Sequence, residues 1–239
     1  MFKKLLATPF TDEDNKEFKT FVVGLAYNSQ NNDFKILRLR SVLLGSEAEA
    51  EIYSLSTDSW RKVVISMESL RGYEPNFGRI VKIDPPCIFL NGALHTVAIT
   101  SRHRFILSFD VNDESFRKIL LPFNHLDVVT FSHHALFKGS LALFAFAVSH
   151  MGVLRDIWVM EEYGVAESWT RKYTVPMIRV EFVNFYGCTD NGELFIKNAT
   201  RLISFDPESQ KQNILAIEDA DWVGFTANSM ESLILLDGE

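Results

Sequence analysis

The chain lacks most of the features from which a chemical activity is read in a sequence. Its 239 residues include only two cysteines, Cys87 and Cys188, which are too few for a disulfide framework. Two thiols without histidines at ligand spacing cannot complete a structural zinc site. No nucleophile elbow, P-loop, dinucleotide fingerprint or metalloprotease helix occurs. We therefore expect no catalytic residue, no metal and no cofactor.

Charge and hydropathy exclude two further kinds of partner. Lys and Arg number 24 against 31 Asp and Glu, and no stretch gathers the basic residues into a stripe that would follow phosphates. No apolar run approaches the length of a membrane span, and the N-terminus lacks the apolar core of a signal peptide. We expect a protein of the reducing cytoplasm or nucleus that binds neither nucleic acid nor membrane.

The six histidines are scattered along the chain. His133 and His134 are adjacent, and successive residues of a strand point to opposite faces, so this pair would be a poor chelate. His95 is expected near the end of an inner strand with its ring hydrogen-bonded. The histidines therefore favour a structural role.

What the chain does contain is an internal repeat. All or part of one phrase occurs in four places, at residues 53–63, 109–119, 168–172 and 205–208. Its aromatic residues Trp60, Phe116 and Trp169 lie 56 and 53 residues apart. Repeats of about 50 residues with short strands are typical of propeller blades, which bury their faces only against neighbouring blades. We expect these three aromatic residues to occupy equivalent buried positions.

Strand signals dominate, and no segment shows a sustained helical period, so an all-β fold is expected. The dipeptides Asn91-Gly92 and Asn191-Gly192 indicate hairpins because both residue types tolerate positive φ. No linker divides residues 1–239, which we expect to form a single domain. Its repeat units are placed at about 21–65, 87–121, 134–175 and 182–217, with terminal strands at 222–236.

The opening residues 2–9 look like the tail of a unit whose beginning is absent. We therefore expect the ring to be incomplete at its N-terminal side, with an unpaired strand edge exposed near the seam.

The long connection at residues 66–83 carries the candidate binding residues Arg71, Tyr73, Phe77 and Arg79. Aromatic residues and arginine are favoured as interface anchors, and a propeller needs only short turns between strands. Two interpretations stay open. Either these side chains contact a partner protein, or Tyr73 and Phe77 fold back onto the core.

Six stretches follow the order of one known family over nearly the whole chain: residues 24–38, 50–61, 89–95, 106–110, 157–169 and 231–236. On these the chain resembles the F-box-associated (type 1) domain of plant F-box/kelch-type proteins, a family that includes the S-locus F-box group. The resemblance implies a kelch-like β-propeller, although the glycine doublets of standard kelch repeats are absent.

The resemblance also implies the substrate-recognition portion of an SCF-type E3 ubiquitin ligase, which holds a target protein while ubiquitination takes place on other subunits. The helical F-box, through which the Skp-family adaptor and the cullin would bind, is missing from these residues. One alternative is a stand-alone or truncated interaction propeller without ligase coupling. An enzyme is disfavoured, because no His, Asp or Glu converge in one register of the repeat.

Overall fold

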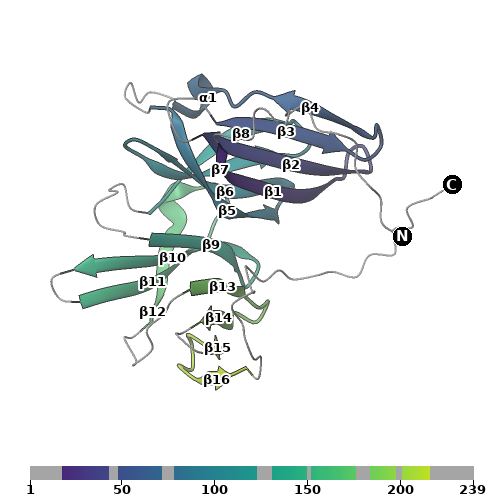
Figure 1. Ribbon diagram of the computed structural model, residues 1–239. Coiled ribbons are helices and arrows are strands. Elements are labelled where there is room, and N and C mark those ends of the chain that lie inside the picture. Colours follow the sequence, from purple (N-terminus) through teal and green to yellow (C-terminus); the bar gives the residue numbers. More distant parts are fainter. Residues whose placement is uncertain are drawn as a thin grey trace.

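The structure is a computed structural model that describes residues 18–42, 48–71, 78–122, 131–149, 152–175, 184–197 and 201–215. These residues form strands β1 to β16, which make four four-stranded antiparallel sheets, each a simple meander (Figure 1). The prediction of an all-β fold built from four-stranded units is confirmed.

Sheets 1 and 2 are separated in the sequence by residues 64–79. Sheet 1 contains β1 (Phe18–Asn28), β2 (Asp33–Val42), β3 (Glu49–Ser54) and β4 (Ser59–Val63). Sheet 2 contains β5 (Ile80–Leu90), β6 (Ala93–Thr100), β7 (Arg104–Asp110) and β8 (Ser115–Leu120). The short helix α1 (Met67–Arg71) lies between them in the sequence.

The last two sheets follow in the same way. Sheet 3 contains β9 (Phe131–Phe137), β10 (Ser140–Ser149), β11 (Gly152–Met160) and β12 (Trp169–Thr174). Sheet 4 contains β13 (Asn184–Cys188), β14 (Leu194–Lys197), β15 (Leu202–Phe205) and β16 (Gln212–Ile214). A single 3₁₀ turn (Ala166–Ser168) precedes β12. No helix in the described ranges is long and apolar enough to cross a membrane.

The first strands of the sheets are the inner strands of the assembly. β1 lies against β5, β5 against β9, and β9 against β13. In Figure 1, sheets 1 and 2 lie together in the upper half of the molecule, with sheet 3 below them and sheet 4 at the bottom. Four meanders stacked with their first strands together are consecutive blades of a β-propeller.

The hydrophobic core lies between the sheets. One cluster of buried side chains joins sheets 1 and 2, a second joins sheets 2 and 3, and a third joins sheets 3 and 4. In β6, Leu94 belongs to the first cluster and Val97 to the second. Because both faces of sheet 2 are buried, its strands do not show the clean alternation of a sheet with one wet face.

The three aromatic residues of the repeat occupy equivalent positions, as predicted. Trp60 pairs across its hairpin with Tyr53, Phe116 with Phe109, and Trp169 with Met160. Phe116 and Trp169 are each 6% exposed. Trp60 is only half-buried, so the prediction of a buried position is wrong for this residue.

The reason lies in which face of the sheet these residues occupy. We call the face turned toward the preceding sheet in the sequence the leading face. Phe116 packs in the cluster shared with sheet 1, and Trp169 in the cluster shared with sheet 2. Trp60 lies on the leading face of sheet 1, against which no described sheet packs.

The second unit starts earlier than expected. The connection predicted at 66–83 ends at Arg79, because β5 begins at Ile80 and runs through Pro85 and Pro86. Prolines normally interrupt a sheet because they cannot donate a backbone hydrogen bond. The register of β5 against β6 shifts between Asp84 and Ile88, which places both prolines in an irregular stretch where no ladder hydrogen bond is required.

Two buried histidines join sheets 2 and 3. His95 is fully buried, and its ring nitrogens lie 3.2 Å from the Ile88 carbonyl and 2.8 Å from the Tyr163 hydroxyl. The Nε2 of buried His134 lies 3.3 Å from the carbonyl oxygen of His95. The expectation of a hydrogen-bonded His95 is confirmed. Burial lowers the pKa of both rings from 6.5 to about 4.

We predict that replacing Gly24 with Ala lowers the free energy of unfolding by about 1–3 kcal/mol, because β1 passes too close to sheet 2 for a methyl group. A Cβ at Gly24 would lie 2.5 Å from the Cys87 sulfur and 2.8 Å from a methyl group of Leu94. Chemical denaturation would measure the loss. Cys87→Ala makes room for the methyl group, so the double variant should lose less stability than the two single variants added together. Strict additivity would contradict this close contact.

A second prediction concerns the effect of low pH on the stability of the fold. Between pH 6.5 and about 4, the folded protein with its neutral rings binds fewer protons than the unfolded chain, so the free energy of unfolding falls as the pH decreases through this window. His134→Gln keeps a donor for the His95 carbonyl and removes the titration. Its unfolding free energy, followed by denaturation at a series of pH values, should fall less steeply than that of the parent chain. His103→Gln is the control on a half-exposed ring. Parallel curves for the parent and His134→Gln would show that this ring does not contribute.

Candidate protein-binding surface

The strand order gives each sheet two different ends. Because neighbouring strands run in opposite directions, the first and third turns of a sheet lie at one end. The second turn and the connection to the next sheet lie at the other. We call these the turn end and the connection end. The three connections between sheets therefore leave one sheet and enter the next at the connection end, where their described parts are residues 64–71 with 78–79, 121–122 and 175.

The turn end is built from short, regular hairpins. Asn91-Gly92 has positive φ at both residues, 49° and 76°, as the sequence predicts for a two-residue turn. Lys138-Gly139 repeats this geometry with φ of 50° and 80°. Asn191-Gly192 differs, because only Gly192 has positive φ and the turn is closed by hydrogen bonds from and to Thr189.

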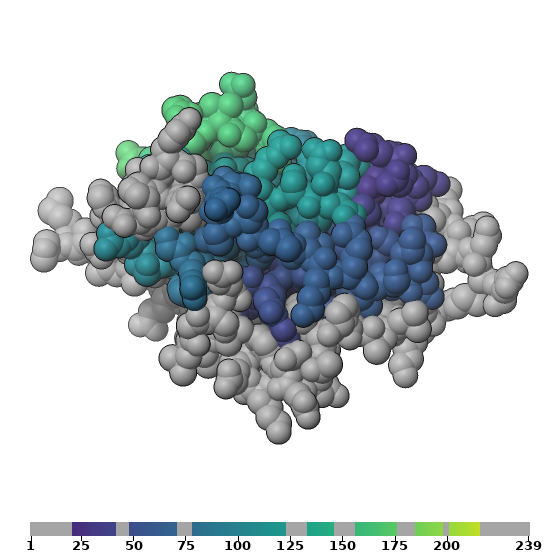
Figure 2. All heavy atoms as spheres, turned by 90° about the horizontal axis from the view of Figure 1, so that it is seen from above, coloured from purple at the N-terminus to yellow at the C-terminus, as the bar shows by residue number. Residues whose placement is uncertain are grey.

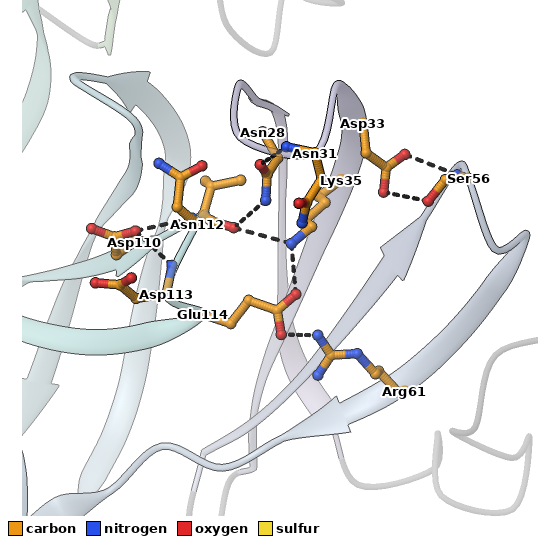
Figure 3. Close-up of polar contacts among 11 residues, drawn as sticks. Asn28, Asn31, Asp33, Lys35, Ser56, Arg61, Asp110, Asn112, Asp113 and Glu114 are labelled. Atoms are coloured by element: carbon orange, nitrogen blue, oxygen red, sulfur yellow. Dashed lines mark hydrogen bonds and ion pairs between the residues drawn. The ribbon is translucent and has the colours of Figure 1, made fainter.

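A polar cluster, in which Asn28 and Lys35 are buried, joins sheets 1 and 2 at this turn end (Figure 3). Lys35 of β2 donates to the Val111 carbonyl at 3.1 Å and to a carboxylate oxygen of Glu114 at 2.6 Å. The other oxygen of Glu114 pairs with Arg61 of β4. Asn28 of β1 donates to the same Val111 carbonyl at 3.1 Å. Three strands of sheet 1 are thus tied to the one turn that joins β7 and β8.

We call Asn28, Lys35, Arg61 and Glu114 the clamp, because their contacts hold sheets 1 and 2 together. Desolvation, and then the positive charge of Arg61, lower the pKa of Lys35, which is a property also found in reactive lysines. Its ammonium group, however, is committed to the Val111 carbonyl and to Glu114, and the Lys35 side chain is only 5% exposed. A buried, paired ammonium group of this kind holds two elements in register.

The described residues offer no cluster of metal-binding side chains. Within those ranges, no three His, Cys, Asp or Glu side chains come together as metal ligands would. Burial raises the pKa of the Cys87 and Cys188 thiols to about 12, which leaves them as weak nucleophiles. A surface that binds another molecule is therefore the candidate functional site.

Two of the four residues proposed from the sequence, Arg71 and Arg79, lie at the connection end. α1 begins after Ser66, whose hydroxyl accepts the Ser69 amide at 3.3 Å, and Leu70 is buried between sheets 1 and 2. Arg71 is the last residue of this helix. Arg79 is exposed just before β5. Tyr73 and Phe77 lie outside the described residues, so both interpretations of these two side chains stand as predictions.

A second arginine, not proposed from the sequence, lies on the turn against which Gly78 rests. A Cβ at Gly78 would lie 3.0 Å from the Ser101 hydroxyl, so this part of the connection rests on the turn between β6 and β7. Thr100 closes that turn by accepting the amides of Arg102, at 3.3 Å, and of His103, at 2.9 Å. Arg102 is exposed. In the sequence, the only feature that marks Arg102 is the basic run Arg102-His103-Arg104.

Arg79 and Arg102 are thus both exposed at the connection end of sheet 2. Guanidinium groups are enriched in protein interfaces because each presents a rigid fork of donors to carboxylates and carbonyls.

Comparison with known proteins identifies the family. Residues 6–231 match the F-box associated beta propeller domain. The F-box protein At4g22390 of Arabidopsis thaliana is 26% identical over 239 aligned residues, which cover 89% of this chain and 56% of that protein. The F-box protein CPR1 of the same plant is 25% identical over 219 residues, covering 82% of this chain and 52% of the relative. The chain spans about half the length of these curated relatives.

A solved structure agrees on the fold alone. The family 117 glycoside hydrolase Zg3597 of Zobellia galactanivorans superposes with a TM-score of 0.50 at 8% identity, over 90% of this chain and 73% of that one. The family match, by contrast, covers nearly all of the sequence and accounts for both the repeat and the blades stacked by their inner strands. The chain belongs to the F-box associated β-propeller family.

Proposed function

We propose that this chain is the target-recognition domain of an F-box protein in an SCF-type E3 ubiquitin ligase of the plant cytoplasm or nucleus. The observation that carries the proposal is the family match over residues 6–231, together with relatives that are F-box proteins. In this role the propeller holds a target protein, and ubiquitin transfer takes place on other subunits. The Skp-family adaptor and the cullin are reached only through an F-box.

The chemistry of the described residues supports binding over catalysis. His95 and His134 are buried; the ring of His134 pairs with the His95 carbonyl, and the ring of His95 pairs with the Tyr163 hydroxyl. Lys35 is held in the clamp between sheets 1 and 2. These three buried titratable groups are therefore used to join blades, which leaves the surface as the functional part.

We further propose that the target binds at the connection end. Loops on a rigid scaffold are where binding residues concentrate, and the long connections between blades all lie at this end. Arg79 and Arg102 supply exposed anchors there, and Arg71, Tyr73 and Phe77 belong to the same 64–79 connection. The turn end offers instead short hairpins whose polar groups pair with one another.

The adaptor test separates a target-recognition domain from a protein that couples to the ligase by itself. These 239 residues are incubated with a purified Skp-family adaptor, with the full-length F-box protein CPR1 as the positive control. We expect adaptor to be retained by the control alone. Robust adaptor binding by this chain would overturn the assignment. Failure of an F-box fusion of this chain to support ubiquitination of a bound target would favour the alternative of an interaction propeller without ligase coupling.

The binding surface is tested by charge reversal. A target captured from plant extract and identified by mass spectrometry should be recovered about ten-fold or more less efficiently by the Arg79→Glu/Arg102→Glu variant, because two interface anchors are inverted. The matched control is Arg117→Glu/Arg171→Glu, which makes the same change of charge on two outer strands at residues 66% and 57% exposed. Equal losses for both double variants would refute the proposed surface.

A further inference from the structure

In sheets 2, 3 and 4, the third turn reaches back to the preceding sheet. In sheet 2 this turn supplies Glu114 of the clamp, and in sheet 4 it supplies Glu208, which lies 2.9 Å from the ammonium group of Lys138. Both contacts are ion pairs. In sheet 3 the turn between β11 and β12 uses Tyr163, whose hydroxyl lies 2.8 Å from the Nε2 of His95 in β6. At this point the junction between sheets 2 and 3 therefore depends on a neutral hydroxyl group.

The hydrogen bond between Tyr163 and His95 has a defined direction. The Nδ1 of His95 lies 3.2 Å from the carbonyl oxygen of Ile88, which can only accept, so Nδ1 carries the ring proton. Nε2 is then the acceptor, and the Tyr163 hydroxyl donates to it. Desolvation raises the pKa of Tyr163, which keeps this hydroxyl protonated at neutral pH. A modification that removes the hydroxyl hydrogen would therefore remove the bond.

A second hydroxyl is available to the same ring nitrogen. The Oγ of Ser108 in β7 lies 3.3 Å from the Nε2 of His95. Because a neutral imidazole has one acceptor nitrogen, the hydroxyls of Tyr163 and Ser108 share a single acceptor site. If Tyr163 withdraws, Ser108 still satisfies His95, and no buried acceptor is left unpaired. The contact of Tyr163 can therefore be released without loss of the fold.

The turn that carries Tyr163 lies at the surface and has its own internal hydrogen bonds. The amide of Gly164 donates to the sulfur of Met160 at 3.1 Å. Residues 161–164 are all exposed, Tyr163 by 39%, and a Cβ at Gly164 would meet nothing within 4 Å. In Figure 2 the light green residues of sheet 3 lie at the molecular surface beside the teal residues of sheet 2. An enzyme can therefore approach this turn from solvent.

The residues before Tyr163 are acidic. Glu161 and Glu162 precede it directly, and both are exposed. Such a segment complements an enzyme whose substrate groove is basic, and charge complementarity speeds the encounter. Tyr27 is a useful comparison, since it is 36% exposed and its hydroxyl donates to Asn32 at 2.6 Å, but two apolar residues precede it. Exposure does not distinguish the two tyrosines, whereas the preceding carboxylates do.

We propose that Tyr163 is a phosphorylation site and that its phosphorylation releases the contact between sheets 2 and 3. A protein kinase transfers the γ-phosphoryl group of ATP to the phenol oxygen: the bond to the β-phosphate breaks, a phosphate ester forms, and the hydroxyl proton leaves. The product has no donor for His95 and carries a charge of about −2 at pH 7. Held in place, it would direct this charge at the lone pair of a neutral ring.

Neighbouring charges favour the outward position of the phosphate. Tyr163 interacts electrostatically with Asp110 and Arg117 of sheet 2. The Asp110 carboxylate repels a phosphate group, whereas the Arg117 side chain is 66% exposed on β8 and its guanidinium group can bind phosphate with two parallel hydrogen bonds. This inference does not rest on the proposed ligase role, because it concerns the turn end and a junction between blades.

Phosphorylation of the folded chain tests the site. The chain is incubated with ATP and a purified tyrosine kinase that selects acidic substrates, and the phosphopeptides are quantified by mass spectrometry. We expect Tyr163 to react about ten-fold or more faster than Tyr27, and the variant Glu161→Gln/Glu162→Gln to lose this advantage. Equal rates at the two tyrosines of the parent chain would overturn the proposal. So would the absence of phosphate on Tyr163 when the chain is isolated from plant cells in the presence of phosphatase inhibitors.

The reactivity of His95 tests the release. Diethyl pyrocarbonate acylates accessible neutral imidazole rings, and phosphotyrosine is incorporated at position 163 during translation. His95 should be acylated about ten-fold or more faster in this chain than in the unmodified chain, because its cover has moved away. Phosphotyrosine at position 27 is the matched control and should leave the His95 rate unchanged. His134, which is 2% exposed, should stay unreactive in every chain. An unchanged His95 rate would overturn the proposal, and reaction of His134 together with His95 would contradict a selective release.

Discussion

A four-stranded sheet that is apolar on both faces is stable only between two neighbours, and the rest of this structure depends on that constraint. Sheet 2 shows it most clearly, since its strands send Leu94 toward sheet 1 and Val97 toward sheet 3. The close approach of Gly24 to Cys87 follows from the same stacking. So does the use of buried polar groups, because His95, His134 and Lys35 all bridge one sheet to the next. Each of these polar groups, removed from water at a junction, finds a partner across the interface.

Much of the fold could be predicted from the sequence because the blades repeat. The shared Ser-aromatic phrase placed Trp60, Phe116 and Trp169 at the same point of their hairpins, and the structure confirms it. A repeat specifies an equivalent position within a blade, but it carries no information about what stands beside that blade. The burial of Trp60 therefore could not be predicted. The early start of β5 was missed for a local reason, since Pro85 and Pro86 signal a break that an irregular register accommodates.

Less of the candidate binding surface could be predicted, because its members meet only through tertiary contacts. Arg79 was identified from composition within one connection. Arg102 joins it because Gly78 rests on Ser101, residues that are distant in the sequence. The pairing of Lys35 with Glu114 likewise spans 79 residues and two sheets, and nothing local marks either residue. Charge pairs across blades are specified by stacking, which a single sequence does not display.

The two ends of the propeller thus have separate roles in our interpretation: the turn end holds blades together, and the connection end binds the target. Hydrogen exchange measured peptide by peptide, on the chain alone and on its complex with a captured target, tests this most directly. We expect exchange to slow in residues 64–79 and 101–103, while residues 28–33, 55–58 and 111–114 remain unchanged. Slowing confined to the three turns, with the connection end unaffected, would contradict it.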